Sequence, residues 1–210
     1  MKTKIGIVCI VLGALLVCGA IGLALFNGHE DATAGNAAAS ILSQLVEQMK
    51  ENTANESTDP DGNDLLDLQV PVDLLTEEDK KMTEVEVDGH AYIGYLSMPT
   101  LGLDLPIMST WSYPKLLIAP CRYTGSIRGE DLVVMAHNFN SHFKKISQLN
   151  VGDSLSFTDM DGVITRYKVV AKDIVDPTAV EEITDGTYDL TLFTCTYSGA
   201  SRITVYCDKE

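Results

Sequence analysis

The chain has 210 residues, of which 45% are hydrophobic, and its formal net charge is −15. This length fits one domain of ordinary size with additional segments, and the apolar content is enough to build a core. The acidic balance argues against a nucleic-acid partner, because phosphate binding requires clustered Lys and Arg. It is compatible with a soluble extracellular domain but identifies no substrate.

The first segment of the chain is long and apolar. Lys2 and Lys4 precede residues 5–26, which contain no charged residue. At 1.5 Å per residue this run covers roughly 33 Å, enough to cross a bilayer core of roughly 30 Å. A cleaved signal peptide is the alternative, but the run is longer than a usual signal h-region. We therefore expect a single-pass membrane anchor over residues 1–28, with an inside N-terminus and the rest of the chain extracellular.

Residues 29–81 are expected to form a helix and a flexible linker. Residues 27–36 are a polar exit from the membrane. Residues 37–50 carry an apolar stripe at helical spacing, formed by Ile41, Leu42, Leu45, Val46 and Met49. Residues 51–64 contain no large apolar side chain and are typical of a mobile linker.

From residue 82 the pattern changes to short β-forming runs separated by turn residues. The candidate strands are residues 83–87, 91–98, 104–108, 131–137, 154–158, 164–173, 189–195 and 202–207. Asp88-Gly89 and Asp161-Gly162 favour hairpin turns, and Phe143 to Leu149 favours a short helix. Many short strands with few helices predict a mostly β fold, a closed or half-closed barrel over residues 82–210.

A cysteine and an arginine bracket one expected hairpin. Cys195 ends a β-rich run, residues 196–201 are small and polar, and Arg202 opens the next run. If the two runs pair, Cys195 and Arg202 become neighbours at one edge of the sheet. A guanidinium beside a thiolate can stabilise it and can donate hydrogen bonds to an oxyanion. A packing cysteine would also fit this position.

A histidine ends another expected strand. Residues 132–136 are apolar, and His137 follows them directly. Histidine titrates in the range that suits the proton-transfer partner of a cysteine nucleophile. A hydrogen-bonded core histidine is the plain alternative. His142 is the rival histidine, but it lies just before the expected helix, so we expect it on the surface.

Other groups of reactive residues give weaker signals. Glu181, Glu182 and Asp185 could bind calcium, although acidic loop residues are usually only solvated. Cys121 and Cys207 could form a disulfide, which spacing alone does not decide. The chain has no glycine-rich phosphate loop and no Cys-x-x-Cys zinc spacing. We predict neither a metal nor a cofactor.

The cysteine region resembles a known family. Thr191-Leu192-Phe193-Thr194-Cys195 is similar to the Thr-Leu-x-Thr-Cys signature of sortases, and Arg202 matches the strand arginine of that family. His137, together with the Gly-Asp step at Gly152-Asp153, resembles the family's histidine region. Residues 92–99 and 105–107 resemble its first barrel strands. The resemblance covers about residues 90–207, with the elements in the family order.

The resemblance implies a sortase-type closed β-barrel of about eight strands with short helices, after an N-terminal transmembrane helix. It implies that Cys195 attacks a sorting signal and forms a thioester, and that His137 protonates the departing amine. Arg202 would position the substrate and stabilise the oxyanion, and Thr194 would shape the substrate-binding pocket.

The partners implied are secreted proteins with a C-terminal sorting signal and an amine from peptidoglycan or a pilin lysine, on a Gram-positive-type cell. The membrane contact would be made by residues 5–26.

The subclass stays open. Class B sortases usually carry a long helical insert before the cysteine strand, whereas residues 174–188 are expected to form only a loop here. The spacing from Cys195 to Arg202 is also short for the family. Asn138 after the histidine and the helix before the barrel are nevertheless class B-like. We expect substrate selectivity to lie in residues 175–188.

Two other functions compete with the transpeptidase. One is another enzyme, a thiol hydrolase or an L,D-transpeptidase-like cell-wall enzyme, of which the latter usually shows a Ser-x-Gly-Cys motif that is absent here. A catalytically inactive, membrane-anchored β-barrel would serve binding or assembly. In that case Cys195 would be a packing residue and Arg202 a surface ion-pair residue.

Overall fold

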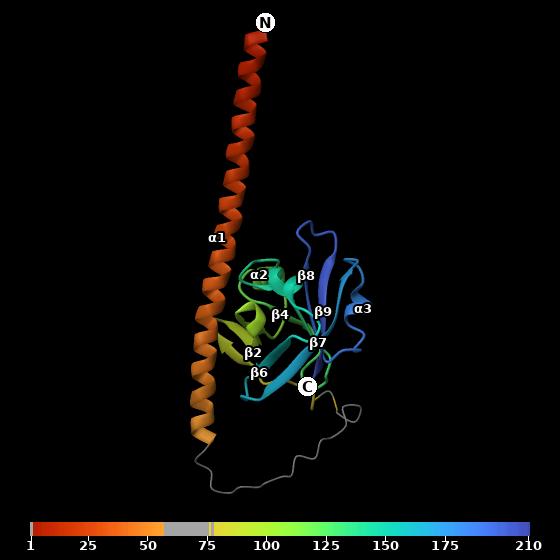
Figure 1. Ribbon diagram of the computed structural model, residues 1–210. Helices are drawn as coiled ribbons and strands as arrows, with labels where there is room; N and C mark the ends of the chain where they lie inside the picture. The colour runs from red at the N-terminus through yellow and green to blue at the C-terminus, as the bar shows by residue number, and fades with distance from the viewer. Residues whose placement is uncertain (1, 57–75, 77) are drawn as a thin grey trace.

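The computed structural model describes residues 2–56, 76 and 78–210, and side chains within α1 are described for residues 10–50. A long helix, α1 (Lys2–Glu56), runs beside a β-barrel and projects well beyond it (Figure 1). Residues 57–64 of the expected linker lie outside the described part of the chain.

Helix α1 is continuous over 55 residues, which corresponds to about 82 Å. The polar exit expected at residues 27–36 is part of this helix, and the linker expected from residue 51 is wrong for residues 51–56, because the helix runs through them. Residues 27–36 contain no proline and include Ala32 and Ala34. Alanine is the strongest helix former, so this polar segment can still continue a helix.

The two halves of α1 have different surroundings. The large apolar side chains from Ile10 to Phe26 are exposed, and this part is long and apolar enough to cross a membrane, with a mean hydropathy of 2.4 in its most apolar window. Further along, Ala34, Ala38, Ile41 and Leu45 are buried against the barrel. The helix expected over residues 37–50 is therefore confirmed, and its apolar stripe packs on the chain itself.

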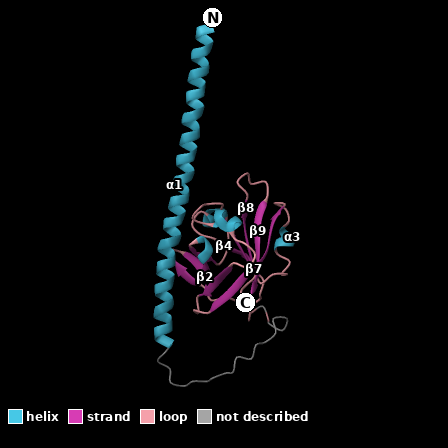
Figure 2. Ribbon diagram, viewed as in Figure 1, coloured by secondary structure: helices cyan, strands magenta, loops and turns pink. Residues whose placement is uncertain are grey.

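Nine strands form one mixed sheet around the core (Figure 2). They are β1 (Val85–Val87), β2 (His90–Met98), β3 (Leu103–Met108), β4 (Cys121–Thr124), β5 (Leu132–Ala136), β6 (Ser154–Asp159), β7 (Ile164–Val175), β8 (Leu190–Cys195) and β9 (Arg202–Lys209). Their order is β1-β2-β3-β4-β5-β8-β9-β7-β6, and pairing of β2 with β6 closes β2 to β9 into a barrel. The prediction of a closed barrel of about eight strands is confirmed.

Among the residues that the structure describes, four short helices lie in the connections. They are η2 (Pro99–Leu101), α2 (Tyr113–Leu116), η3 (Phe143–Gln148) and α3 (Val180–Ile183). The expected helix at residues 143–149 is confirmed as η3. Strand β4 was not predicted, because it is only four residues long and directly follows Pro120. The segment 174–188 is not only a loop, since it contains α3.

The core has separate apolar clusters, and α1 completes one of them. The largest cluster fills the barrel and includes Leu192, Val205 and Cys207. A second cluster, containing Cys121, packs under Ile41 and Leu45 of α1. Cys121 and Cys207 are both free, so the disulfide considered for them is not formed. Burial raises the pKa of Cys121 to about 12, which makes this thiol inert as a nucleophile at neutral pH.

Closure of the barrel depends on a glycine in β2. Gly94 has φ +144°, and a Cβ built on it would lie 2.1 Å from the carbonyl oxygen of Thr158 in β6. Its backbone pairs with Asp159 in the β2–β6 ladder. Any larger residue must therefore push the two closing strands apart.

We expect Gly94→Ala to lower the free energy of unfolding by about 2–4 kcal/mol, through both steric overlap and an unfavourable φ. Gly89→Ala is the matched control, because Gly89 has φ +75° and no neighbouring atom within 4 Å. It should cost about 1 kcal/mol, which is the backbone term alone. Urea unfolding of the two variants would measure the difference, and equal losses would contradict the closure argument.

Candidate active site

Two parallel strands bring a histidine and a cysteine together. In the β5–β8 ladder Ala136 pairs with Thr194, and the next residues are His137 and Cys195. Because parallel strands run in the same direction, both residues emerge at the same edge of the sheet. The buried hydroxyl of Thr194 donates a 2.8 Å hydrogen bond to the carbonyl oxygen of Ala136, which fixes this junction.

The antiparallel β8–β9 ladder adds the arginine. Cys195 pairs with Arg202, as expected from a hairpin, and residues 196–201 form the connecting loop. The Arg202 Nη1 donates 3.2 Å hydrogen bonds to the carbonyl oxygens of Gly199 and Ser201. In the part of the chain that the structure describes, no carboxylate forms an ion pair with Arg202. The guanidinium is therefore held by its own loop, and its charge adds to the hydrogen bonds from Thr178 in lowering the pKa of Asp176.

A groove of about 640 Å³ opens over Cys195 and His137. One wall is the β8–β9 loop from Thr196 to Gly199, and a second is the segment Asn138–Asn140 with Lys144. The third wall is α1, which contributes Ala24, Asn27, Gly28, Glu30 and Asp31. Sequence reasoning did not assign these α1 residues to the site. The only feature of the sequence that pointed to them was the acidic pair Glu30-Asp31, shortly after the apolar run of residues 5–26.

His137 is half-buried in this groove, with its ring 5.0 Å from that of Phe139. Burial lowers the pKa of His137, and the negative charge of Glu30 opposes that shift. Burial therefore favours the neutral imidazole, and the position of His137 beside Cys195 suits an acid–base group.

An apolar pocket of about 150 Å³ lies on the other side of Arg202. Aromatic rings form much of it, because Trp111 stacks on Tyr123 at 5.7 Å and Tyr123 meets Phe193 edge-on at 5.4 Å. Val180 and Ile183 of α3 also line it. Part of residues 175–188, the segment expected to govern substrate selectivity, thus lines a pocket that Arg202 also lines.

Thr194 is 1% exposed and is engaged with Ala136. Its expected role in shaping the substrate-binding pocket stays a prediction.

His142 is not on the surface, so that prediction is wrong. Its side chain is 0% exposed and lies beneath Phe139, with ring centroids 5.5 Å apart. The reason is that η3 turns inward and buries Phe143 and Ile146, which draws the preceding residue into the core. Burial, with a smaller contribution from the charge of His137, lowers the pKa of His142 to about 4.

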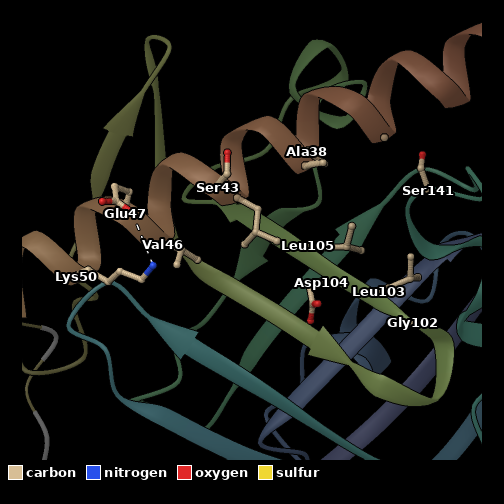
Figure 3. Close-up of a pocket in the computed structure, with 13 residues that line it drawn as sticks. Ala38, Ser43, Val46, Glu47, Lys50, Gly102, Leu103, Asp104, Leu105 and Ser141 are labelled. Atoms are coloured by element: carbon tan, nitrogen blue, oxygen red, sulfur yellow. Dashed lines mark ion pairs between the residues drawn. The ribbon is translucent and has the colours of Figure 1, made fainter.

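A second groove, of about 670 Å³, runs between α1 and β3 (Figure 3). Its lining includes Ala38, Val46 and Leu105, but no cysteine or histidine. It therefore offers neither a thiol nor an imidazole. Among the described residues no three His, Cys, Asp or Glu side chains gather as a metal site, and this includes Glu181, Glu182 and Asp185.

The comparisons with known proteins agree with the geometry. A sortase domain family matches residues 96–210. Sortase C1 from Streptococcus suis is 25% identical, with a TM-score of 0.52 over 58% of this chain and 74% of that one. Sortase C from Clostridium perfringens SM101 is 21% identical, with a TM-score of 0.52 over 80% of this chain and 89% of that one.

A Clostridium perfringens sortase D5 transpeptidase has the same fold at 20% identity, with a TM-score of 0.52 over 65% of this chain and 90% of that one. No match was found among the curated proteins compared with this chain.

The buried His142 predicts a stability loss in mild acid. Its pKa is about 4 in the folded chain and about 6.5 when unfolded, so as pH falls from 6.5 to 4 the unfolded state takes up the proton first. The stabilisation present above pH 6.5 is lost in this window, by about 2 kcal/mol between pH 7 and pH 5. Urea unfolding at both pH values would measure the loss.

His142→Phe fills a similar volume and should remove that part of the pH dependence. His137 also has a lowered pKa, so the difference between the wild type and His142→Phe isolates His142. An unchanged pH dependence in His142→Phe would contradict the assignment.

Proposed function

Because the chain belongs to the sortase family, we propose that it is a cysteine transpeptidase that cleaves a sorting signal in secreted proteins and transfers them to an amine. The observation that carries the proposal is the β5–β8–β9 ladder. It sets His137 beside Cys195 at one edge and pairs Cys195 with Arg202. The groove above them supplies space for a peptide.

In the proposed reaction, the Cys195 thiol gives its proton to His137, and the resulting thiolate Sγ attacks the scissile carbonyl carbon. The C–N bond breaks, and His137 gives a proton to the departing amine. The acyl group is then held on sulfur as a thioester. An incoming amine attacks the thioester, His137 takes up its proton, and the Cys195 sulfur leaves. This sequence is ordinary covalent acyl transfer with one acid–base group.

Arg202 is proposed to stabilise the oxyanion of the two tetrahedral intermediates. Its hydrogen bonds to two loop carbonyls hold the guanidinium close to its pairing partner, Cys195. Donors that are already in place when charge develops contribute more to catalysis than donors that must reorganise. Oxyanion binding requires Arg202 to present at least one free N–H group toward the groove.

The proposed substrates are secreted proteins with a C-terminal sorting signal, and the proposed acceptors are peptidoglycan or pilin amines. We place residues 5–26 of α1 in the cell membrane and the barrel on its outer face. The exposed apolar side chains of α1 and the lysines before them support this topology.

The apolar pocket beside Arg202 is proposed to bind an aliphatic side chain of the sorting signal. Phe193 lies two residues before Cys195 in β8, so it faces the same side of the sheet. Its neighbours Trp111, Tyr123 and Ile183 supply apolar area, and Arg202 is the charged residue in the lining. A side chain close to the scissile bond can therefore leave water as the bond approaches Cys195.

We expect Cys195→Ala to abolish peptide cleavage and amine transfer, because no other described thiol lines the groove. His137→Ala should lower the rate by about 10²–10⁴. Arg202→Ala should lower it by about 10²–10³, with partial recovery in Arg202→Lys. Quenched sorting-signal peptides with triglycine as acceptor, followed by mass spectrometry, would measure both steps.

Iodoacetamide labelling provides the control for an inactive barrel. Among the described thiols outside α1, labelling should go to Cys195, because Cys121 and Cys207 are buried. Transfer that survives Cys195→Ala would sink the proposed mechanism. A wild-type chain with neither turnover nor labelling at Cys195 would favour the binding or assembly role.

A charge in the apolar pocket should weaken peptide binding. We expect Val180→Asp to raise KM for the preferred peptide by about tenfold, because the new carboxylate loses hydration when an apolar side chain covers it. Val180 is 45% exposed, so folding should tolerate the change. Val163→Asp is the matched control at a 57% exposed site outside this pocket, and its KM should stay at the wild-type value. An equal KM in both variants would argue against the pocket.

A further inference from the structure

We propose that Asp31 of α1 is a positioning residue for the active site: it holds the loop that follows His137, so the N-terminal helix sets the geometry of the reaction. The inference rests on the proposed function for its kinetic consequence. The contact itself rests on the geometry of residues 31 and 137–144, and it can be tested without turnover.

The side chain of Asp31 binds two consecutive residues of the loop. Its Oδ2 accepts hydrogen bonds from the backbone N–H of Asn140 at 3.1 Å and from the Asn140 Nδ2 at 2.6 Å. Its Oδ1 accepts from the backbone N–H of Ser141 at 2.9 Å and from the Ser141 Oγ at 2.6 Å. The Ser141 Oγ also lies 3.0 Å from the carbonyl oxygen of Asp31. Both carboxylate oxygens of Asp31 thus accept hydrogen bonds from residues that are more than 100 positions away in the sequence.

The bonds favour an ionised Asp31. Partial burial opposes the charge, but the hydrogen bonds from Ser141 and Asn140 lower the pKa of Asp31 to about 2. The carboxylate therefore stays charged at every pH at which the enzyme would work. Hydrogen bonds to a charged acceptor are roughly twice as strong as neutral ones, so this single side chain is a strong anchor for the loop.

The loop is compact enough to pass this anchoring on to His137. The carbonyl oxygen of His137 accepts from the N–H of Phe143 at 3.3 Å, and that of Phe139 accepts from the N–H of His142 at 3.0 Å. The Phe139 ring lies between the rings of His137 and His142. A shift of Asn140 and Ser141 would therefore move the residues that hold the imidazole of His137.

The helix is also shaped for this approach. Gly35 lies one turn after Asp31, and a Cβ built on it would be 2.9 Å from the Cβ of Ser141. Ala34 and Ala38 are buried on the same side of α1. Figure 3 shows Ser141 pointing toward α1 from the loop beneath it. A glycine weakens a helix by about 1 kcal/mol relative to alanine, so close approach is the advantage that glycine brings here.

A neighbouring charge acts on the same histidine. Glu30 lines the groove beside Asp31, and its negative charge raises the pKa of His137 against the effect of burial. One turn of α1 therefore supplies both a mechanical hold on the loop and a charge near the acid–base group.

The test uses the full chain in lipid nanodiscs. The substrate is the quenched sorting-signal peptide that the wild type turns over fastest, and triglycine is the acceptor. Asp31→Ala should lower kcat by about 10–100-fold and change KM by less than about threefold, because a small displacement of an acid–base group slows chemistry more than binding. Asp31→Asn keeps one side-chain oxygen and should recover part of kcat.

Gly35→Ala tests the same contact without a change of charge. It should strengthen the helix and still lower kcat, because its Cβ crowds Ser141. Glu47→Ala is the matched control for charge on α1. Glu47 is exposed, pairs only with Lys50 at 3.7 Å among the described residues, and should leave kcat unchanged.

A wild-type kcat in Asp31→Ala, or an equal loss in Glu47→Ala, would overturn the inference. Hydrogen exchange at the amides of Asn140 and Ser141 gives a readout that needs no substrate. These amides should be protected in the wild type and exchange at least tenfold faster in Asp31→Ala, and equal exchange would overturn the contact. If the wild type transfers no peptide, the proposed function fails while this exchange result still decides the contact.

Discussion

The parallel pairing of β5 with β8 is the constraint on which the active site depends. It joins strands that are more than 50 residues apart, and it aligns Ala136 with Thr194. A slip of one residue would turn the side chains of the shifted strand to the opposite face and separate His137 from Cys195. The Thr194 hydroxyl bonded to the Ala136 carbonyl oxygen opposes that slip, at the last paired position before the two reactive side chains.

The barrel and the helix hold the site from two directions. The ladders place Cys195 and Arg202 on the rigid edge of a closed sheet, where their backbone has little freedom. His137 follows the end of its strand and lies on a loop, which needs a second support. The carboxylate of Asp31 supplies this support from outside the barrel, through its hydrogen bonds to Asn140 and Ser141.

Much of the fold and part of the site follow from local sequence. Alternating apolar residues and Asp-Gly turns predicted all strands except β4, and the small polar loop between Cys195 and Arg202 predicted their pairing across a hairpin. The neighbourhood of β5 and β8 does not follow in this way, because a parallel pair has no connecting turn in the sequence to reveal it. Only the family resemblance predicted that His137, after β5, acts together with Cys195, at the end of β8.

The errors had physical causes of their own. His142 is polar and lies beside Ser141, so nothing local indicates that η3 turns it into the core. Residues 51–56 are polar and were expected to begin a linker, yet α1 runs through them, and they contain no proline or glycine that would end a helix. The contacts of Asp31 with Asn140 and Ser141 could not be predicted from local sequence either, because the partners are more than 100 residues apart.

The continuity of α1 has a consequence for how substrates reach the enzyme. With residues 5–26 in a bilayer, Asp31 lies only about 7.5 Å further along the helix axis than Phe26. A disordered tether would allow the barrel to sample many heights and tilts, whereas a helix is a semi-rigid spacer. The catalytic groove would then stay close to the lipid headgroups. Distance of the scissile bond from the membrane would become a criterion of selection, independent of the amino acids on either side of that bond.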